Sequence, residues 1–410
     1  MKSFKQILAA TAILLSCSDV ARGASQATPQ MGWNTWNAFK YNVSQDLLVH
    51  TADLLVSTGL KDAGYTNLVL DDGWQALNRS EDGKPQPNAT KFPNGIPPVA
   101  EHIHQAGLRF GIYMTNGIKG CGPNSPGSWG FEEIDAQQFA DWNVDYLKYD
   151  NCGTFEAGTH PPQSRFRVMS NALRETGRDI LYSLCQWGDQ FPWYWADQVA
   201  HSYRISGDIT ATFSDRGKDC ACKTAYCLNT GYAGCSVMTI IRKMREISYF
   251  QHPGSFADMD MLEIGIANLT LHEERTHFSF WAALKSPLIV GADLRKITNE
   301  TLSVLKNKKM IAVNQDKLGS AIEYLPHISK ELEHQIWAGQ LSGNRTIVLA
   351  FNELNDTMTI DVPFSSIPRL NNGSSYKVED VWSESSQTAR SSITASLESH
   401  ETKVYIFKEE

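Results

Sequence analysis

The stretch GIPPVAEHIHQAGLRFGIYM (residues 95–114) joins a helical pattern, which ends at a glycine, to a short apolar strand. The same unit of strand, polar end and helix recurs from about residue 31 to residue 315. An open doubly wound sheet would more often begin with a glycine-rich phosphate loop, which this sequence lacks. The number of units and the length of the region therefore predict a (β/α)8 barrel. Its strand candidates are MGWNTWN (31–37), TNLVLDD (66–72), LRFGIYM (108–114), VDYLKYD (144–150), DILYSLC (179–185), SYRISGD (202–208), SFADMDM (255–261) and PLIVGAD (287–293).

The pattern changes after about residue 315, where short strands with turn residues between them replace the helices. These strands predict a small antiparallel β-sandwich. We therefore divide the chain into a signal peptide (1–24), a catalytic barrel (25–315) and a C-terminal β-sandwich (316–410). The strand candidates of the sandwich are HQIWAGQL (334–341), RTIVLAFNEL (345–354), TMTIDVPF (357–364), YKVEDVW (376–382) and ETKVYIFK (401–408).

The N-terminus predicts export from the cell. Lys2 and Lys5 precede the apolar run ILAATAILL (7–15), and small residues near Ala24 follow it, as in a secretory signal peptide. The apolar run is too short to span a bilayer. The formal net charge of −8 argues against nucleic acid and anionic membranes as partners. Eight N-x-S/T triplets add to the prediction of a secreted, extracellular glycoprotein, and they begin at Asn42, Asn78, Asn88, Asn268, Asn299, Asn344, Asn355 and Asn372.

Seven cysteines remain once the signal peptide is removed, so at least one thiol is unpaired. The segment DCACKTAYCLNTGYAGC (219–235) is compatible with a zinc knuckle or with a loop held by disulfides. An oxidising compartment favours disulfides. Sequence does not fix their connectivity, and we choose the nested pairs Cys220–Cys235 and Cys222–Cys227. We predict no metal and no cofactor.

Carboxylates and aromatic side chains gather at the predicted ends of the barrel strands, where barrel enzymes carry their active sites. Lys148 and Asp150 point to the same side of their strand because side chains alternate along it. A single acid could cap the following helix, or pair structurally with a neighbouring cation. So many acids beside aromatic faces favour a sugar-binding site. The residues at the strand ends are Trp33, Asp71, Asp72, Tyr113, Lys148, Asp150, Cys185, Trp187, Arg204, Asp208, Asp258, Asp260 and Asp293.

Six stretches resemble family 27 of the glycoside hydrolases, the α-galactosidases and α-N-acetylgalactosaminidases. They are MGWNTWN, VLDDGW (69–74), YLKYDNC (146–152), YRISGD (203–208), DMDMLEIG (258–265) and AVNQDKLG (312–319). The resemblance covers essentially the whole mature chain. It implies a retaining exo-glycosidase that releases terminal α-galactose, with α-N-acetylgalactosaminidase or β-L-arabinopyranosidase activity as the alternative. A carbohydrate-binding protein without catalysis is a further alternative, but both expected carboxylates are present.

The resemblance also implies a role for each site residue. Asp150 matches the nucleophile and Asp208 the general acid/base. Cys121 and Cys152 match a disulfide that lies against the sugar, and Cys185 is then the unpaired thiol. The resemblance places Cys185 and Trp187 beside the substituent on the second carbon of the sugar. The positions that match residues holding the sugar are Trp33, Asp71, Asp72, Lys148, Arg204 and Asp260.

Three physical expectations follow from these roles. A retaining mechanism needs two carboxyls roughly 5 Å apart. Lys148 and Arg204 should keep Asp150 ionised, whereas Asp208 needs a raised pKa to be protonated at rest. The bulky indole of Trp187 predicts preference for galactosides over N-acetylgalactosaminides, unless that indole packs beneath the strand.

The chain departs from the family at one pair of positions. Many relatives carry two cysteines where this chain has Tyr41 and Gly73. The absence of both together leaves the chemistry in place but puts the stability of the local loops in question. The cysteine-rich segment 219–235 resembles a fungal insertion. The natural substrate, whether a raffinose-type oligosaccharide or a galactomannan branch, and the oligomeric state do not follow from the sequence.

Overall fold

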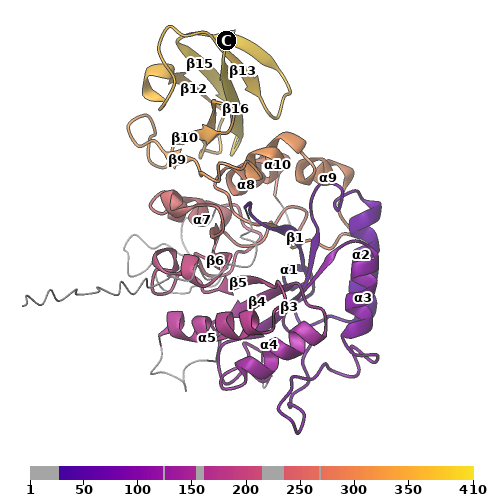
Figure 1. Ribbon diagram of the computed structural model, residues 1–410. Helices are drawn as coiled ribbons and strands as arrows, with labels where there is room; N and C mark the ends of the chain where they lie inside the picture. The colour runs from indigo at the N-terminus through magenta and orange to yellow at the C-terminus, as the bar shows by residue number, and fades with distance from the viewer. Residues whose placement is uncertain (1–26, 123–124, 154–160, 215–234, 267–268) are drawn as a thin grey trace, which may run out of the picture.

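The computed structural model describes residues 27–122, 125–153, 161–214, 235–266 and 269–410. Its larger part is an eight-stranded parallel sheet that curls into a barrel surrounded by helices (Figure 1). The sheet order β7-β6-β5-β4-β3-β2-β1-β8 is sequential, as expected when each strand is followed by a helix. All eight strand candidates are strands, with bounds β1 Met31–Asn34, β2 Asn67–Leu70, β3 Arg109–Thr115, β4 Tyr146–Asp150, β5 Leu181–Cys185, β6 Ser202–Arg204, β7 Phe256–Asp258 and β8 Leu288–Val290.

The barrel closes through the segment that follows β7. The backbone N–H of Leu262 donates to the carbonyl of Ile289 in β8 at 2.7 Å, and the N–H of Gly291 donates to the carbonyl of Leu262 at 3.2 Å. Between β7 and this bridge, Asp260 adopts a φ of +77°, which is uncommon for a non-glycine residue. The chain therefore bends at Asp260 before it completes the ring.

The helices lie outside the sheet, and local signals mark where several begin. Ser44 accepts a hydrogen bond from Leu47 at the start of α2, and Thr270 with Glu273 forms a capping box at the start of α8. In Figure 1, α2 and α3 lie along one side of the barrel. The helices of this region are α1 Trp36–Phe39, α2 Gln45–Ser57, α3 Pro97–Gln105, α4 Glu132–Asp141, α5 Pro162–Glu175, α7 Val237–Met244, α8 Leu271–Ala283, α9 Asn299–Leu305 and α10 Lys308–Asn314, with single 3₁₀ turns η2 Pro192–Tyr194, η3 Ala196–Gln198 and η4 Ser248–Phe250.

Side-chain alternation separates two environments along the strands. Val69, Tyr146 and Leu181 form a small cluster of their own, apart from the main core. Residues on the opposite faces of the strands, such as Leu68 and Leu147, join the large core between sheet and helices. Tyr146, Lys148 and Asp150 occupy every second position of β4, so their side chains share one face of the strand. Tyr146 belongs to the small cluster inside the barrel, so all three side chains point into the barrel.

The C-terminal part is the predicted antiparallel sandwich, coloured orange to yellow in Figure 1. A six-stranded sheet in the order β14-β13-β16-β11-β10-β9 packs on the pair β12-β15, with a separate core between them. The sequence analysis missed three strands: β9 has only two residues, β14 is polar and exposed, and β15 shows the polar–apolar alternation of a half-buried strand but was not predicted. The bounds are β9 Glu323–Tyr324, β10 His334–Leu341, β11 Arg345–Asn352, β12 Met358–Pro363, β13 Tyr376–Asp380, β14 Ser386–Ala389, β15 Ser392–Leu397 and β16 Thr402–Glu409, with the turn η5 Phe364–Ser366.

Polar and aromatic contacts attach the sandwich to helices α7 and α8. Arg242 in α7 and Arg245, which directly follows this helix, both pair with the buried carboxylate of Glu353. Phe280 in α8 packs edge-on against Phe351, with ring centroids 5.6 Å apart. These contacts join the two parts through a continuous core. Within the described residues, none of the helices has the length and apolar character needed to cross a membrane.

Candidate active site

Lys148 and Asp71 form the ion pair at the centre of the site. The ammonium of Lys148, on β4, lies 2.6 Å from Oδ2 of Asp71, which directly follows β2. Asn34, at the end of β1, donates to the same carboxylate oxygen at 2.8 Å. Burial opposes a positive charge on Lys148, but the neighbouring acids outweigh it and raise the pKa of Lys148 well above its usual value. The site therefore contains a permanently charged ammonium group.

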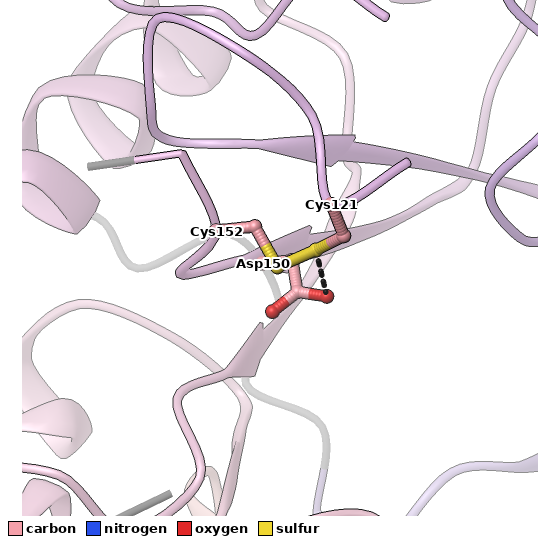
Figure 2. A group of neighbouring side chains, drawn as sticks. All are labelled: Cys121, Asp150 and Cys152. Carbon is pink, nitrogen blue, oxygen red and sulfur yellow. Dashed lines mark hydrogen bonds between the residues drawn. A yellow bond between two sulfur atoms is a disulfide. The ribbon is translucent and has the colours of Figure 1, made fainter. Parts of the chain in front are cut away.

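Asp150 is held in a fixed orientation two residues further along β4. Its Oδ1 accepts from the backbone N–H of Asn151 at 2.7 Å, and its Oδ2 accepts from the hydroxyl of Tyr113 at 2.9 Å. The sulfur of Cys121 lies 3.3 Å from Oδ2 (Figure 2), but a disulfide sulfur has no proton to donate. Burial raises the pKa of Asp150 to about 6, although the charge of Lys148 opposes this rise.

Arg204, on β6, connects the remaining acids. Its guanidinium lies 2.6 Å from Asp260 and 3.2 Å from Asp208. The guanidinium and Asp260 are buried, whereas the side chain of Asp208 is 50% exposed. Burial favours a higher pKa for Asp208, but the charges of Arg204 and Lys148 outweigh it and lower the pKa below its usual value.

The protonation order of the two carboxyls differs from the sequence-based expectation. We expected an ionised Asp150 and a protonated Asp208, but the structure raises the pKa of Asp150 and lowers that of Asp208. The reason is that Arg204 pairs with Asp208 directly, whereas Lys148 is paired with Asp71. The sequence alone does not reveal which of two nearby cations forms an ion pair with which carboxylate.

A polar cavity extends from these residues into the barrel. Its lining contains both cations and two of the acids, together with smaller polar and apolar side chains. The lining residues are Asn34, Tyr146, Lys148, Ser183, Cys185, Arg204, Asp258, Asp260, Met261 and Ile289. Cations and carboxylates around a small polar cavity can bind the hydroxyls of a sugar ring, and two carboxyls can exchange a proton and attack a carbon atom.

The cysteines adopt the arrangement implied by the family resemblance where the structure describes them. Cys121 and Cys152 form a disulfide with a Cα–Cα distance of 5.0 Å, and Cys185 is a buried free thiol. Cys121, Cys152 and Asp150 lie close enough together to suggest metal ligands, but two sulfurs joined to each other are not thiolates. Cys235 is disulfide-bonded. Its predicted partner Cys220 lies outside the described residues, as does the predicted pair Cys222–Cys227.

Two predicted positions lie elsewhere than expected. Trp33 points toward the helices, because its neighbour Asn34 lines the cavity and side chains alternate. Trp33 is fully buried and its indole N–H donates to the carbonyl of Ala292, so the prediction that it contacts sugar is wrong. Asp293 pairs with Arg295 at 2.7 Å and is absent from the cavity lining.

Two other predicted residues are not among those that line the cavity. Trp187 is half-buried and adopts a φ of +63°, a strained conformation of the kind that clusters at functional sites. Asp72 is buried, and its Oδ1 accepts from the N–H of Gly73 at 2.7 Å. Burial raises the pKa of Asp72, and the charge of Asp71 adds to this effect.

The sequence analysis assigned no role to Asn34 and Lys40, and named Asp258 only as one of the acids at the strand ends. Asn34 orients Asp71 through a hydrogen bond. Its position at the end of β1 was the sequence feature that could have identified it as a site residue. Asp258 lines the cavity, and burial raises its pKa to about 6. Lys40 lies near enough to Asp208 for its charge to help lower the pKa of that carboxyl. Lys40 is distant from Asp208 in sequence, so only the folded chain reveals this effect.

Comparisons with known proteins agree with the geometry of the site. Residues 28–316 match the family model described as alpha galactosidase A, and residues 331–407 match that of the alpha galactosidase C-terminal β-sandwich domain. An α-galactosidase of Cyamopsis tetragonoloba is 37% identical over 380 residues, which cover 92% of this chain and 86% of the relative.

Two solved structures extend the comparison to the fold. Alpha-galactosidase I from Mortierella vinacea superimposes with a TM-score of 0.89 at 38% identity, covering 94% of this chain and 98% of that one. The α-galactosidase of Saccharomyces cerevisiae, solved with raffinose, gives a TM-score of 0.87 at 32% identity, covering 95% and 99%.

Proposed function

Because the chain belongs to the α-galactosidases of glycoside hydrolase family 27, we propose that it cleaves terminal α-D-galactosyl groups by double displacement, with retention at the anomeric carbon. The observation that carries this proposal is the pair Asp150 and Asp208, which both lie within reach of the charge of Lys148 but differ in exposure. One carboxyl is buried and oriented, as a nucleophile requires. The other is open to solvent, as a proton shuttle requires.

In the first step an oxygen of Asp150 attacks the anomeric carbon, and the bond from that carbon to the leaving oxygen breaks. Asp208 gives its proton to the leaving oxygen. In the second step Asp208 takes a proton from water, whose oxygen attacks the anomeric carbon and releases Asp150. Tyr113 and the N–H of Asn151 hold both oxygens of Asp150 throughout.

The proton must reach Asp208 before the first step. The pKa of Asp208 is lowered, and that of Asp150 is about 6. At pH values between these two, the pair of carboxyls holds one proton. A bound galactoside would cover the exposed half of Asp208 and remove water from it, which favours the protonated form. Ester formation then neutralises Asp150 and removes a negative charge near Asp208, so that Asp208 becomes a carboxylate base.

The stereochemistry of the first product tests this mechanism. Two inversions at one carbon give α-galactose, whereas direct attack of water would give β-galactose. Proton NMR during the first minutes of p-nitrophenyl α-galactoside hydrolysis should show the α-anomer before mutarotation produces the β-anomer. Initial accumulation of β-galactose would exclude the nucleophilic role of Asp150.

We propose that the remaining charged groups hold the hydroxyls of galactose. Asp71, Asp72 and Asp260 offer carboxylate acceptors, and Lys148 and Arg204 offer donors. The relative solved with raffinose supports oligosaccharides as one class of substrate for this chain. Galactomannan branches are the other class of substrate, and hydrolysis assays should compare the rates for the two classes.

Trp187→Ala is expected to weaken galactoside turnover and to admit some N-acetylgalactosaminide, whereas the unaltered protein strongly prefers galactosides. Trp187 follows the cavity-lining Cys185 by two residues, and a packed indole does not yield to an added acetamido group. The measurement is kcat/KM for both p-nitrophenyl substrates. Trp193→Ala removes another half-buried indole from the same connection and should leave the ratio unchanged. Comparable wild-type values for the two substrates would refute the steric argument.

We also propose that the protein is secreted and glycosylated after removal of residues 1–24. Six of the asparagines in the predicted acceptor triplets are exposed, which is what glycan attachment requires: Asn42, Asn78, Asn299, Asn344, Asn355 and Asn372. Asn88 is half-buried, and Asn268 lies outside the described residues. Mass spectrometry of the secreted protein before and after removal of N-glycans tests occupancy and the N-terminus together.

A further inference from the structure

The ammonium of Lys91 joins two loops at the rim of the site. Its Nζ donates to the carbonyl of Tyr41, which lies in the loop after α1, at 2.7 Å. It also donates to the carbonyl of Gly73, which follows Asp71 and Asp72, at 2.6 Å. A charged donor makes stronger hydrogen bonds than a neutral one. One side chain therefore links the connections that follow the first two strands.

The backbone of Lys91 is itself fixed, so its ammonium acts from a rigid base. Its N–H donates to the carbonyl of Asn88 at 3.0 Å, and its carbonyl accepts from Gln45 at the start of α2 at 2.9 Å. The next residue, Phe92, is buried in the core. Burial lowers the pKa of Lys91, and the charge of Asp72 partly opposes this, which places Lys91 within electrostatic reach of Asp72.

Gly73 couples Lys91 to the carboxylate of Asp72. The N–H of Gly73 donates to Oδ1 of Asp72, while its carbonyl accepts from Lys91. The φ of Gly73 is +94°, a conformation that suits glycine and few other residues. Because both sides of this residue are bound, a displacement of its carbonyl would also displace the group that orients Asp72.

The two loops are in close contact. A Cβ atom built on Gly73 would lie 3.0 Å from Cα of Tyr41 and 3.4 Å from its Cβ. Disulfides have Cβ–Cβ distances of about 3.5–4.5 Å. The separation of 3.4 Å is just below this range, so a cysteine pair at these two positions would come close to disulfide geometry. In this chain the ammonium of Lys91 and two carbonyls link the loops at this point instead.

We propose that Lys91 is a positioning residue of the galactose site, which joins the two loops and thereby holds Gly73 and Asp72 in place. This inference rests on the proposed role of Asp72 in binding the sugar. Asp72 would contact galactose in both the ground state and the transition state, so its displacement changes binding more than the chemical step.

Lys91→Met, which keeps the length of the side chain and removes the charge, tests the proposal. KM for p-nitrophenyl α-galactoside and the inhibition constant of galactose should both rise by about tenfold, with kcat changed by less than about threefold. Lys91→Arg retains charged donors and should restore most of the binding. Adding Lys91→Met to Asp72→Asn should raise KM little further, because both changes act on one contact.

A covalent link provides a second, independent test. Tyr41→Cys with Gly73→Cys, oxidised and combined with Lys91→Met, should return KM toward the wild-type value. The control is the same cysteine pair in a protein that keeps Lys91. Any rise of its KM measures the strain that a side chain causes at Gly73. If Lys91→Met alone folds poorly, the oxidised triple variant still decides the matter. A KM in it that stays well above that of the oxidised cysteine pair with Lys91 intact would overturn the proposal.

The outcomes separate this inference from the proposed function. If Asp72→Asn leaves KM unchanged, Asp72 does not bind galactose and the inference fails with that role. If Asp72→Asn raises KM while Lys91→Met leaves it at the wild-type value, only the inference about Lys91 fails.

Discussion

Asp150→Asn is expected to lower kcat/KM for α-galactosides by on the order of 10⁴-fold or more, because a neutral amide does not form the glycosyl ester. The fold should persist, with a Tm at pH 7 no lower than that of the unaltered protein. Burial raises the pKa of Asp150 to about 6, so the folded state binds a proton that the unfolded chain loses near pH 4. The ionised carboxylate therefore costs stability above pH 6, and the amide removes that cost.

Asp150→Ala with added azide would show which carboxyl is the nucleophile. Azide would attack an activated α-galactoside directly, and a single displacement gives β-galactosyl azide. In Asp208→Ala, azide would instead attack the galactosyl ester of Asp150, and two displacements give α-galactosyl azide. Thermal unfolding and circular dichroism serve as controls for folding. If the two variants gave the opposite anomers, the roles of Asp150 and Asp208 would have to be exchanged.

Asp208→Asn is expected to reduce raffinose hydrolysis by about 10²–10⁴-fold, the range that general acid catalysis contributes. The first step should be much less affected for a dinitrophenyl galactoside, because that leaving group departs without a proton. The second step still lacks its base, so the galactosyl ester should accumulate after a burst of phenolate. Stopped-flow absorbance measures the burst, and mass spectrometry detects the ester. Equal losses for the two substrates would show that Asp208 does not protonate the leaving group.

The same variant should change the pH dependence of the reaction. In the unaltered protein kcat/KM should fall above pH 6, where the Asp150–Asp208 pair loses its last proton. In Asp208→Asn only the ionisation of Asp150 matters, so kcat/KM for the activated substrate should rise with pH to a plateau. The midpoint should lie below about 6, because the charge of Asp208 no longer raises the pKa of Asp150. A declining profile in the variant would show that another group supplies the proton.

The strained backbone at two site residues agrees with a functional origin for this region. Trp187 and Asp260 both adopt positive φ angles. Such conformations persist only where the surroundings compensate for their cost. The carboxylate of Asp260 accepts from the N–H groups of Ile209 and Met261, both at 2.8 Å, and pairs with Arg204. These contacts hold the bend at the point where the barrel closes.

The sequence identified the barrel because its signals are local. An apolar strand, a polar end and a capped helix each span a few residues, and their repetition leaves few possible architectures. Alternation along β4 likewise places Lys148 and Asp150 on one face without knowledge of the rest of the chain. The weaker strands β9 and β14 were missed because their residues carry little apolar pattern, and pairing with neighbouring strands stabilises them instead. The strand β15 was missed although its polar and apolar residues alternate.

The sequence alone therefore determined the order of the strands, the rim to which the acids belong, and the shared face of Lys148 and Asp150, since each depends on neighbours along the chain. Only the tertiary structure decided that Arg204 pairs with Asp208, that Leu262 closes the barrel, and that Lys91 joins two loops. These features depend on distances between atoms that are remote in sequence. Charges and hydrogen bonds act through those distances, and the folded chain alone fixes them.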